Sequence, residues 1–185
     1  MTDEKQVLLE QADLARAIRR MAHEINEKCL DPTELVLIGI RSRGVHLARR
    51  LARNIEEFGK FRPPVTAIDV SPFRDDRVAT PESSAVGAFE TEPVVDDKTV
   101  VLVDDVIYRG RTIRAAMEAV ERLGQAKRIL VAVLIDRGAR ELPIRADIVG
   151  KNIDVAEGQR VNVRLLEADG IDQVFLVHWR GRNAG

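Results

Sequence analysis

Residues 99–116 read TVVLVDDVIYRGRTIRAA, and this stretch decides how the chain is expected to fold. A buried apolar strand over residues 99–103 is followed by two adjacent acids, Asp104 and Asp105, and then by a turn that contains Gly110. Two neighbouring carboxylates repel each other, so the packing of a strand does not by itself call for them. The pattern indicates that the acids bind a group from outside the strand.

Other segments of the chain repeat this alternation of strand and helix. A continuous apolar run of strand length occurs at 35–40 (LVLIGI), and the segments 65–70 (VTAIDV) and 128–135 (RILVAVLI) are also read as strands. Apolar residues at helical spacing predict helices over residues 11–29, 45–58 and 112–123. Strands that are apolar throughout and alternate with helices indicate a parallel sheet with helices on both faces. We therefore predict an α/β fold with a central parallel sheet, in a single domain over residues 1–185.

Two regions depart from this alternation. The stretch 71–97 is rich in Pro, Ser, Thr and acidic residues, and a long irregular segment inside a compact domain is typically a functional lid. We predict a mobile lid at about residues 74–92. Near the carboxyl end, ADIVG (146–150), VNVRLL (161–166) and QVFLVHW (173–179) are read as shorter strands of a small cap, or hood.

Composition restricts the classes of function. The 29 basic and 30 acidic residues nearly cancel, so any nucleic-acid surface must be a local patch. The single cysteine, Cys29, excludes an internal disulfide and a cysteine-based metal site, and a buried thiol in a reducing compartment is expected. The sequence has neither an apolar run near the roughly 20 residues that span a bilayer nor a signal peptide. We therefore expect a cytoplasmic protein without a membrane partner.

The chemistry of the candidate site follows from the loops that leave the strands. Ligands of open parallel sheets bind beyond the carboxyl ends of the strands, and here the loops 41–44, 104–112 and 136–145 leave those ends. Gly110 allows close backbone approach, and the amides that open the next helix favour a phosphate, which Thr112 can contact unless it caps the helix. The acids can accept hydrogen bonds from sugar hydroxyls. A phosphorylated sugar is indicated, although Asp104 and Asp105 could also simply end a strand and cap a helix.

Longer motifs then point to a family. VVLVDDVIYRGRT (100–112) closely resembles the phosphoribosyl diphosphate (PRPP) motif of type I phosphoribosyltransferases. AHEINEK, LIGIRSRGVHLARRLA, FRDD and DRGARELPIRADIVGKNI resemble, in order and spacing, the family of pyrimidine operon attenuation regulators, which are bifunctional uracil phosphoribosyltransferases. The matching segments span roughly residues 14–165. RELPIRAD followed by GKN is the narrower signature, whereas the PRPP motif alone names only the superfamily.

The resemblance implies a type I phosphoribosyltransferase fold and a set of site residues. Asp104, Asp105 and Arg43 would be catalytic, with the two acids holding the ribose hydroxyls. Mg²⁺ would be bound mainly through PRPP and diphosphate, without a metal cage made by the protein. The expected substrate-binding residues are Ser42, Arg43, Asp104, Asp105, Val106, Ile107, Tyr108, Arg109, Gly110, Arg111, Thr112, Arg137 and Val161.

A second surface is expected to bind RNA. Arg19 and His23 lie opposite the apolar face of the first predicted helix, and a solvated helix face is the alternative reading of that pattern. Arg140, Arg145 and Lys151 form a second basic group in the segment 136–151. The resemblance implies a leader-RNA stem-loop as the partner. The expected RNA-binding residues are Arg19, His23, Arg140, Arg145 and Lys151.

The resemblance also implies a function, and four segments of this sequence differ from the family pattern. We expect attenuation of pyrimidine genes, with UMP or UTP promoting RNA binding, together with synthesis of UMP and diphosphate from uracil and PRPP. A homodimer or an assembly of dimers is implied. A purely metabolic phosphoribosyltransferase and a non-catalytic nucleotide-sensing RNA regulator remain alternatives.

The family usually has Thr at Arg109, His at Ala139, Leu-Tyr at 72–73 and Pro-Thr-Ser at 154–156; the change at Arg109 predicts weak catalysis.

Overall fold

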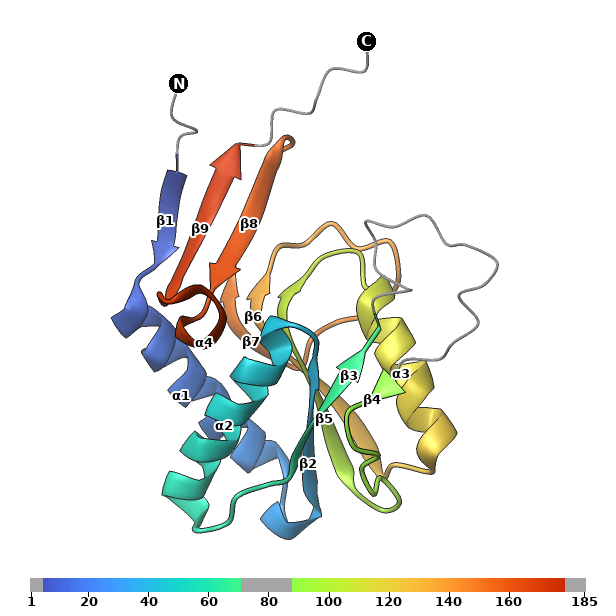
Figure 1. The fold of residues 1–185 in the computed structure, drawn as a ribbon. Helices are drawn as coiled ribbons and strands as arrows, with labels where there is room; N and C mark the ends of the chain where they lie inside the picture. Colours follow the sequence, from blue (N-terminus) through green and yellow to red (C-terminus); the bar gives the residue numbers. More distant parts are fainter. Residues whose placement is uncertain (1–4, 71–87, 179–185) are drawn as a thin grey trace.

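The computed structural model describes residues 5–70 and 88–178 (Figure 1). Two sheets, with helices packed around them, make up this part of the chain. The elements in chain order are β1 (Lys5–Leu9), α1 (Gln11–Lys28), η1 (Pro32–Glu34), β2 (Leu35–Ile40), α2 (Arg43–Gly59), β3 (Val65–Asp69), β4 (Ala88–Phe89), β5 (Thr99–Ile107), α3 (Arg111–Leu123), β6 (Arg128–Asp136), β7 (Ile148–Asn152), β8 (Gln159–Arg164), α4 (Leu166–Asp169) and β9 (Gln173–His178).

The larger sheet has the strand order β4-β3-β2-β5-β6-β7, and all its neighbours pair in parallel except β4 with β3. Helices α1 and α2 cover one face and α3 the other (Figure 1). Strand β2 is buried at every position, because a strand covered on both faces has no side chain in water. The predicted central parallel sheet with flanking helices is confirmed.

The start of α2 packs closely against two central strands, at Gly39 near the end of β2 and at Val103 of β5. A Cβ atom added to Gly44 would lie 2.4 Å from the carbonyl oxygen of Val103, and one added to Gly39 would lie 2.4 Å from the Cα atom of Val45. Both distances are far below any real contact, so only glycine fits at these two positions. The parallel register pairs Gly39 with Val103, so the carboxyl end of β2 lies beside β5 just before the two acids. The 41–43 loop therefore lies next to Asp104.

The smaller sheet is the predicted hood, with β9 between β1 and β8 and antiparallel to both. Strands β1 and β9, from opposite ends of the chain, lie side by side (Figure 1). Two of the three short strands expected near the carboxyl end belong to this sheet. The third joins the larger sheet instead, as β7 beside β6. The remaining strand of the hood is β1, paired with β9, which the sequence did not predict.

Several boundaries differ from the prediction. Strand β5 continues through the two acids to Ile107, because its pairing with β6 extends to Ile107 and Asp136. Helix α3 begins at Arg111 with Gly110 as its N-cap, so Thr112 does not cap it. Of the predicted lid, residues 74–87 lie outside the described residues, whereas Ala88–Phe89 pair with β3 at the sheet edge.

An arginine of α2 attaches the hood to the larger sheet. Arg50 donates hydrogen bonds to both carboxylate oxygens of Glu167, at 2.9 and 2.6 Å, and to both of Asp172, at 2.9 and 2.7 Å. The Arg50 and Asp172 side chains are only 13% and 10% exposed. The bonds from Arg50 hold the pKa of Glu167 below its ordinary value. The contribution of this contact to stability is therefore present above the ordinary carboxyl pKa and is lost as the pH falls through the lowered pKa. The anchor is therefore intact at neutral pH.

Two further expectations bear on the environment of the protein. Cys29 is buried, as predicted, and its thiol donates to the carbonyl oxygen of Asp31 at 3.1 Å. Among the described residues, no helix is both long and apolar enough to cross a membrane.

Candidate active site

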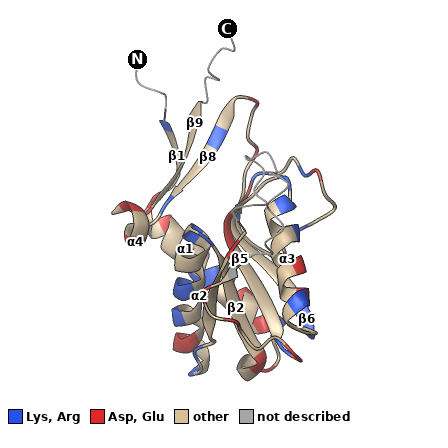
Figure 2. Ribbon diagram, turned by 45° about the vertical axis from the view of Figure 1, so that its right-hand side comes forward, with Lys and Arg blue, Asp and Glu red and all other residues tan. Residues whose placement is uncertain are grey.

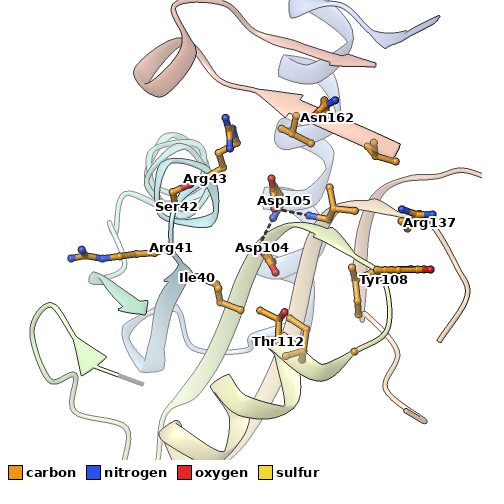
Figure 3. Close-up of a pocket in the computed structure, with 16 residues that line it drawn as sticks. Ile40, Arg41, Ser42, Arg43, Asp104, Asp105, Tyr108, Thr112, Arg137 and Asn162 are labelled. Carbon is orange, nitrogen blue, oxygen red and sulfur yellow. Dashed lines mark hydrogen bonds between the residues drawn. The ribbon is translucent and has the colours of Figure 1, made fainter. Parts of the chain in front are cut away.

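A pocket of about 300 Å³ opens at the carboxyl edge of the larger sheet, beneath the hood (Figure 3). The 41–43 loop, the end of β5, the start of α3 and strand β8 supply its walls. Eleven of the thirteen predicted substrate-binding residues line it; Arg109 and Arg111 do not. The lining residues are Ile40, Arg41, Ser42, Arg43, Asp104, Asp105, Val106, Ile107, Tyr108, Gly110, Thr112, Ile113, Arg137, Val161, Asn162 and Val163.

The two acids lie at the centre of the pocket (Figure 3). Asp104 is 8% exposed, and one of its carboxylate oxygens accepts a hydrogen bond from the amide of Asp105 at 2.9 Å. Asp105 accepts in the same way from the amide of Val106, also at 2.9 Å. Both side chains are thereby oriented as hydrogen-bond acceptors inside the pocket.

The turn before α3 provides an anion-binding element. Gly110 has a φ of 94°, a left-handed conformation that glycine adopts readily, and it opens a helix of 13 residues. The first amides of a helix have no carbonyl partner within it, and the helix dipole favours negative charge there. Thr112 lies in the first turn and lines the pocket. A phosphate bound at this turn would lie beside the two acids.

The 41–43 loop supplies the opposite wall, and the peptide bond between Arg41 and Ser42 is cis. Arg43 lines the pocket, and its guanidinium points toward the hood (Figure 3). Its Nε and Nη2 atoms donate to the two carboxylate oxygens of Asp169, at 3.1 and 2.7 Å. These bonds raise the pKa of Arg43 and lower that of Asp169. Arg43, which the resemblance implies is catalytic, is thus already bound to a carboxylate.

Tyr108 and Arg137 form the far end of the pocket. The guanidinium carbon of Arg137 lies 4.0 Å from the centre of the Tyr108 ring, and burial lowers the pKa of Arg137. Its buried Nε atom has no hydrogen-bond partner among the described residues. Val161 of β8 lines the same pocket. This end therefore combines an aromatic ring, an apolar side chain and an unsatisfied donor, which suits a flat ring with carbonyl oxygens.

Arg109 and Arg111 both turn toward Glu141. Arg109 Nε lies 3.1 Å from one of the carboxylate oxygens, and Arg111 Nη2 lies 2.6 Å from the other. The backbone of both arginines is part of the turn before α3, whereas their side chains help to hold the 136–145 loop beside that turn.

The predicted RNA-binding residues do not share one environment. His23 stacks on Phe58 of α2, with 3.7 Å between ring centres, and Arg19 lies over the same Phe58 ring. Lys151 is exposed and donates to the carbonyl oxygen of Leu8 at 3.2 Å, and Arg145 is exposed. Helices α1 and α2 carry acidic as well as basic positions, and in α2 the acidic ones lie together near the carboxyl end of the helix (Figure 2). The amphipathic pattern of the first helix gave no indication of the stack with Phe58.

Arg140 differs from the others because its guanidinium is directed inward. It donates to the carbonyl oxygens of Ile144, Tyr108 and Gly138 at 2.9, 2.9 and 3.2 Å, and to the carboxylate of Asp136 at 2.6 Å. Its side chain is 20% exposed and that of Asp136 is 15% exposed. The arginine expected at an RNA surface therefore holds the 136–145 loop against the pocket.

Sequence reasoning missed five lining residues. Ile40 and Ile113 belong to a strand and a helix whose apolar patterns indicate core positions, and Arg41 directly precedes the predicted pair Ser42–Arg43. Asn162 and Val163 follow the predicted Val161 along β8, and only the placement of the hood over the pocket brings them in. The extension of the site to Arg41 could have been found from its position in the loop; the hood contacts could not.

Comparison with known proteins gives the class to which this fold and site belong. Residues 6–166 match the family described as "Phosphoribosyl transferase domain". In fold, the chain is similar to the hypoxanthine phosphoribosyltransferase of Trypanosoma cruzi, with a TM-score of 0.73, 19% identity and coverage of 96% of this chain and 93% of that one. The hypoxanthine phosphoribosyltransferase of Staphylococcus aureus gives a TM-score of 0.70 at 19% identity, over 96% and 92% of the two chains. The fold is that of a type I phosphoribosyltransferase.

Relatives of much higher sequence identity show to which family of phosphoribosyltransferases the chain belongs. The chain is 48% identical to the bifunctional protein PyrR of Chloroflexus aurantiacus, over 96% of this chain and 97% of that protein. It is 47% identical to the bifunctional protein PyrR of Pelotomaculum thermopropionicum, over 96% and 98% of the two. The chain belongs to the PyrR family of phosphoribosyltransferases.

The position of Arg140 generates a prediction about stability. Arg140→Ala removes the partner of a mostly buried carboxylate and three bonds to loop carbonyls, so it should lower the free energy of unfolding by about 2–3 kcal/mol. Urea denaturation measures this change, and Arg145→Ala, at an exposed position in the same segment, is the control, with an expected change within about 0.5 kcal/mol. Equal effects of the two variants would mean that the Arg140 contacts do not stabilise the loop.

Proposed function

We propose that this protein binds pyrimidine-operon leader RNA in a uridine-nucleotide-dependent manner and also converts uracil and PRPP to UMP and diphosphate. The observation that carries the proposal is the meeting, in one pocket, of two carboxylates, a helix N-terminus and an arginine loop, in a chain whose close relatives are named bifunctional PyrR proteins. The pocket has a place for each part of PRPP and for a flat base. The cytoplasmic location and an assembly of dimers belong to the same proposal.

The substrate is assigned by the chemistry of each wall. Asp104 and Asp105 accept hydrogen bonds from the ribose hydroxyls, and the amides from Gly110 to Thr112 receive the 5′-phosphate. Ser42 and Arg43 face the diphosphate. Uracil lies between Tyr108 and Arg137 on one side and Val161 on the other, with the Arg137 guanidinium available to a ring carbonyl.

The reaction then needs little more than positioning. Uracil N1 forms a bond to C1′ as the bond from C1′ to the diphosphate oxygen breaks. The bonding electrons leave with diphosphate, and the N1 proton of uracil is released to water. Positive charge develops on the sugar, beside the two carboxylates, and negative charge on the leaving group, beside Arg43. The hood narrows the pocket and limits the access of water, which competes with uracil for C1′.

Mg²⁺ fits this site as a substrate-held ion. Among the described residues, no group of three or more His, Cys, Asp or Glu side chains could enclose a metal. Mg²⁺ commonly binds through one or two carboxylates together with substrate phosphates. Asp104 and Asp105 are the carboxylates in the pocket that would lie near it, and the ion would neutralise charge on the diphosphate.

The RNA surface proposed here combines an aromatic stack with exposed cations. Bases of single-stranded loops stack on aromatic side chains, and the paired rings of His23 and Phe58 offer such a platform beside Arg19. Arg145 and Lys151 supply exposed positive charge for phosphates. Arg140 acts in this proposal through the loop that carries Arg145, since its own guanidinium is directed inward.

The decisive experiment measures the affinity for the organism's own leader RNA with and without UMP. UMP should tighten leader binding by about 5- to 150-fold, the usual range for coupled sites, and the same preparation should form UMP from uracil and PRPP. Scrambled RNA of equal length is the control. Leader binding no better than scrambled binding under both conditions would leave a metabolic enzyme, and coupled RNA binding without UMP formation would leave a non-catalytic regulator.

The same assay locates the RNA surface. Arg145→Ala should weaken leader binding and reduce the slope of log affinity against log salt by about one, because one phosphate contact is lost, while uracil conversion stays unchanged. The matched control is Arg62→Ala, an exposed arginine before β3 at the opposite end of the sheet from β7. An equal loss in the two variants would place Arg145 outside the RNA surface.

A further prediction concerns catalytic strength. Arg109 stands where the family has Thr, and its side chain turns to Glu141 rather than lining the pocket. Arg109→Thr would add a hydroxyl at the phosphate turn, and a hydrogen bond to a charged group is worth roughly 1.5–3 kcal/mol. We expect kcat/KM for PRPP to rise by on the order of ten- to a hundredfold in steady-state kinetics.

Arg109→Ala is the control for this prediction, because it removes the guanidinium without adding a hydroxyl. We expect no comparable rise in kcat/KM for this variant. If Arg109→Thr left kcat/KM unchanged or lower, Arg109 would itself be a competent phosphate ligand, and the activity would not be weak for this reason.

A further inference from the structure

Two arginines on one side of α2 hold the base of the hood. Arg43 and Arg50 are seven residues apart, about two helical turns, and therefore lie on the same side of the helix. Arg50 binds Glu167 and Asp172, and Arg43 binds Asp169. All three acids lie within the segment 166–172, in and directly after α4.

The two anchors differ in their relation to the active site. The Arg50 side chain is 13% exposed and is absent from the pocket wall, whereas Arg43 is 32% exposed and lines the pocket. Arg50 is held by two carboxylates, Arg43 by Asp169 alone among the bonds described. Arg50 thus provides a lasting attachment, and the Arg43 contact can be exchanged without releasing the hood.

A carboxylate on Arg43 conflicts with the task proposed for that residue. Asp169 occupies the Nε and Nη2 donors, one of the two edges through which a planar guanidinium binds a carboxylate or a phosphate in a bidentate manner. The Asp169 charge also offsets that of Arg43 and repels an anion next to it. Diphosphate and Asp169 therefore compete for the same donors.

We propose that Asp169 is a positioning residue that holds Arg43 in the ligand-free protein and gives it up when a diphosphate group binds. The inference rests on the proposed function, because it takes the 41–43 loop as the diphosphate site. Asp169 keeps a second partner after the exchange, since its Oδ2 atom also accepts from the amide of Leu165 at 2.9 Å. Leu165 directly follows β8, the strand that carries Val161 and Asn162 into the pocket. The exchange at Arg43 is thereby linked to the base-binding end.

Asp169→Asn tests this proposal, because the amide oxygen can still accept from Leu165 while the charge that holds Arg43 is lost. The matched control is Asp172→Asn, which removes one negative charge from the same segment, also accepts a backbone amide, from Leu166 at 2.8 Å, and binds Arg50 instead of Arg43. Titration calorimetry with inorganic diphosphate and Mg²⁺ is run on the wild-type protein and both variants. Asp169→Asn should bind diphosphate about three- to fivefold more tightly, the size expected for loss of a competing, partly exposed ion pair, and Asp172→Asn should match the wild type.

Kinetics separate this role from a merely structural one. In Asp169→Asn the KM for PRPP should fall while kcat does not rise, because diphosphate leaves more slowly; a structural defect would raise KM or lower kcat with no tighter binding. Asp169→Glu, which restores the charge, should return diphosphate affinity toward the wild-type value. Unchanged or weaker diphosphate binding by Asp169→Asn would overturn the inference, as would equal tightening in both Asn variants. If the wild-type protein bound neither diphosphate nor PRPP, the proposed function would fail first, and this inference with it.

Discussion

The geometry of the pocket depends on how closely α2 approaches β5 at Val103, directly before the two acids. A side chain at Gly44 would overlap the carbonyl of Val103, and the neighbouring turn is equally tight at Gly39. Because these two glycines let backbone meet backbone, the 41–43 loop lies beside Asp104 and Asp105. The parallel ladder between β2 and β5 fixes this register, so the positions of the cationic loop and the acids are set by the strands.

Several arginines in and around the pocket are bound to carboxylates of the protein itself. Arg43 is bound to Asp169, Arg109 and Arg111 share Glu141, and Arg140 is bound to Asp136. The contacts of Arg43, Arg109 and Arg111 join distant segments of the chain, whereas Arg140 and Asp136 lie within the 136–145 loop. The same contacts that organise the loops also occupy these cations. In our proposal, binding of a diphosphate group exchanges the partner of Arg43 as well as filling the pocket. In our account this exchange links the nucleotide site to the hood.

The sequence predicted those parts of the fold that depend on local pattern. Apolar runs gave β2 and β6, and helical spacing gave α1 and α3, because burial on a sheet or a helix face leaves a regular signal. Strand β1, with Lys5 and Gln6 at its start, is mostly exposed and carries no such signal; its pairing with β9 brings together the two ends of the chain. The segment 146–150 reads as a strand, but nothing local tells whether it joins the hood or the larger sheet.

For the candidate site, too, the sequence predicted the features that depend on neighbouring residues and missed those that depend on tertiary contacts. The acids and the glycine turn are adjacent in sequence, so their chemistry could be read directly from residues 104–112. The partner of each arginine could not, because Arg43 and Asp169, or Arg109 and Glu141, meet only through tertiary structure. Arg140 shows the consequence: its charge indicated a nucleic-acid contact, and its bonds to Asp136 and the Tyr108 carbonyl give it a place inside the loop.

The central claim is that one pocket, with the two acids at its centre, binds the ribose phosphate of a uridine nucleotide. Calorimetric titration of UMP into the wild-type protein and into the double variant Asp104→Asn, Asp105→Asn tests it most directly. Our account predicts one UMP per chain for the wild type, displaced by PRPP, and at least a tenfold loss of affinity in the double variant, since two charge-assisted hydrogen bonds are weakened. Equal affinity of the two proteins for UMP, or simultaneous binding of UMP and PRPP, would contradict it.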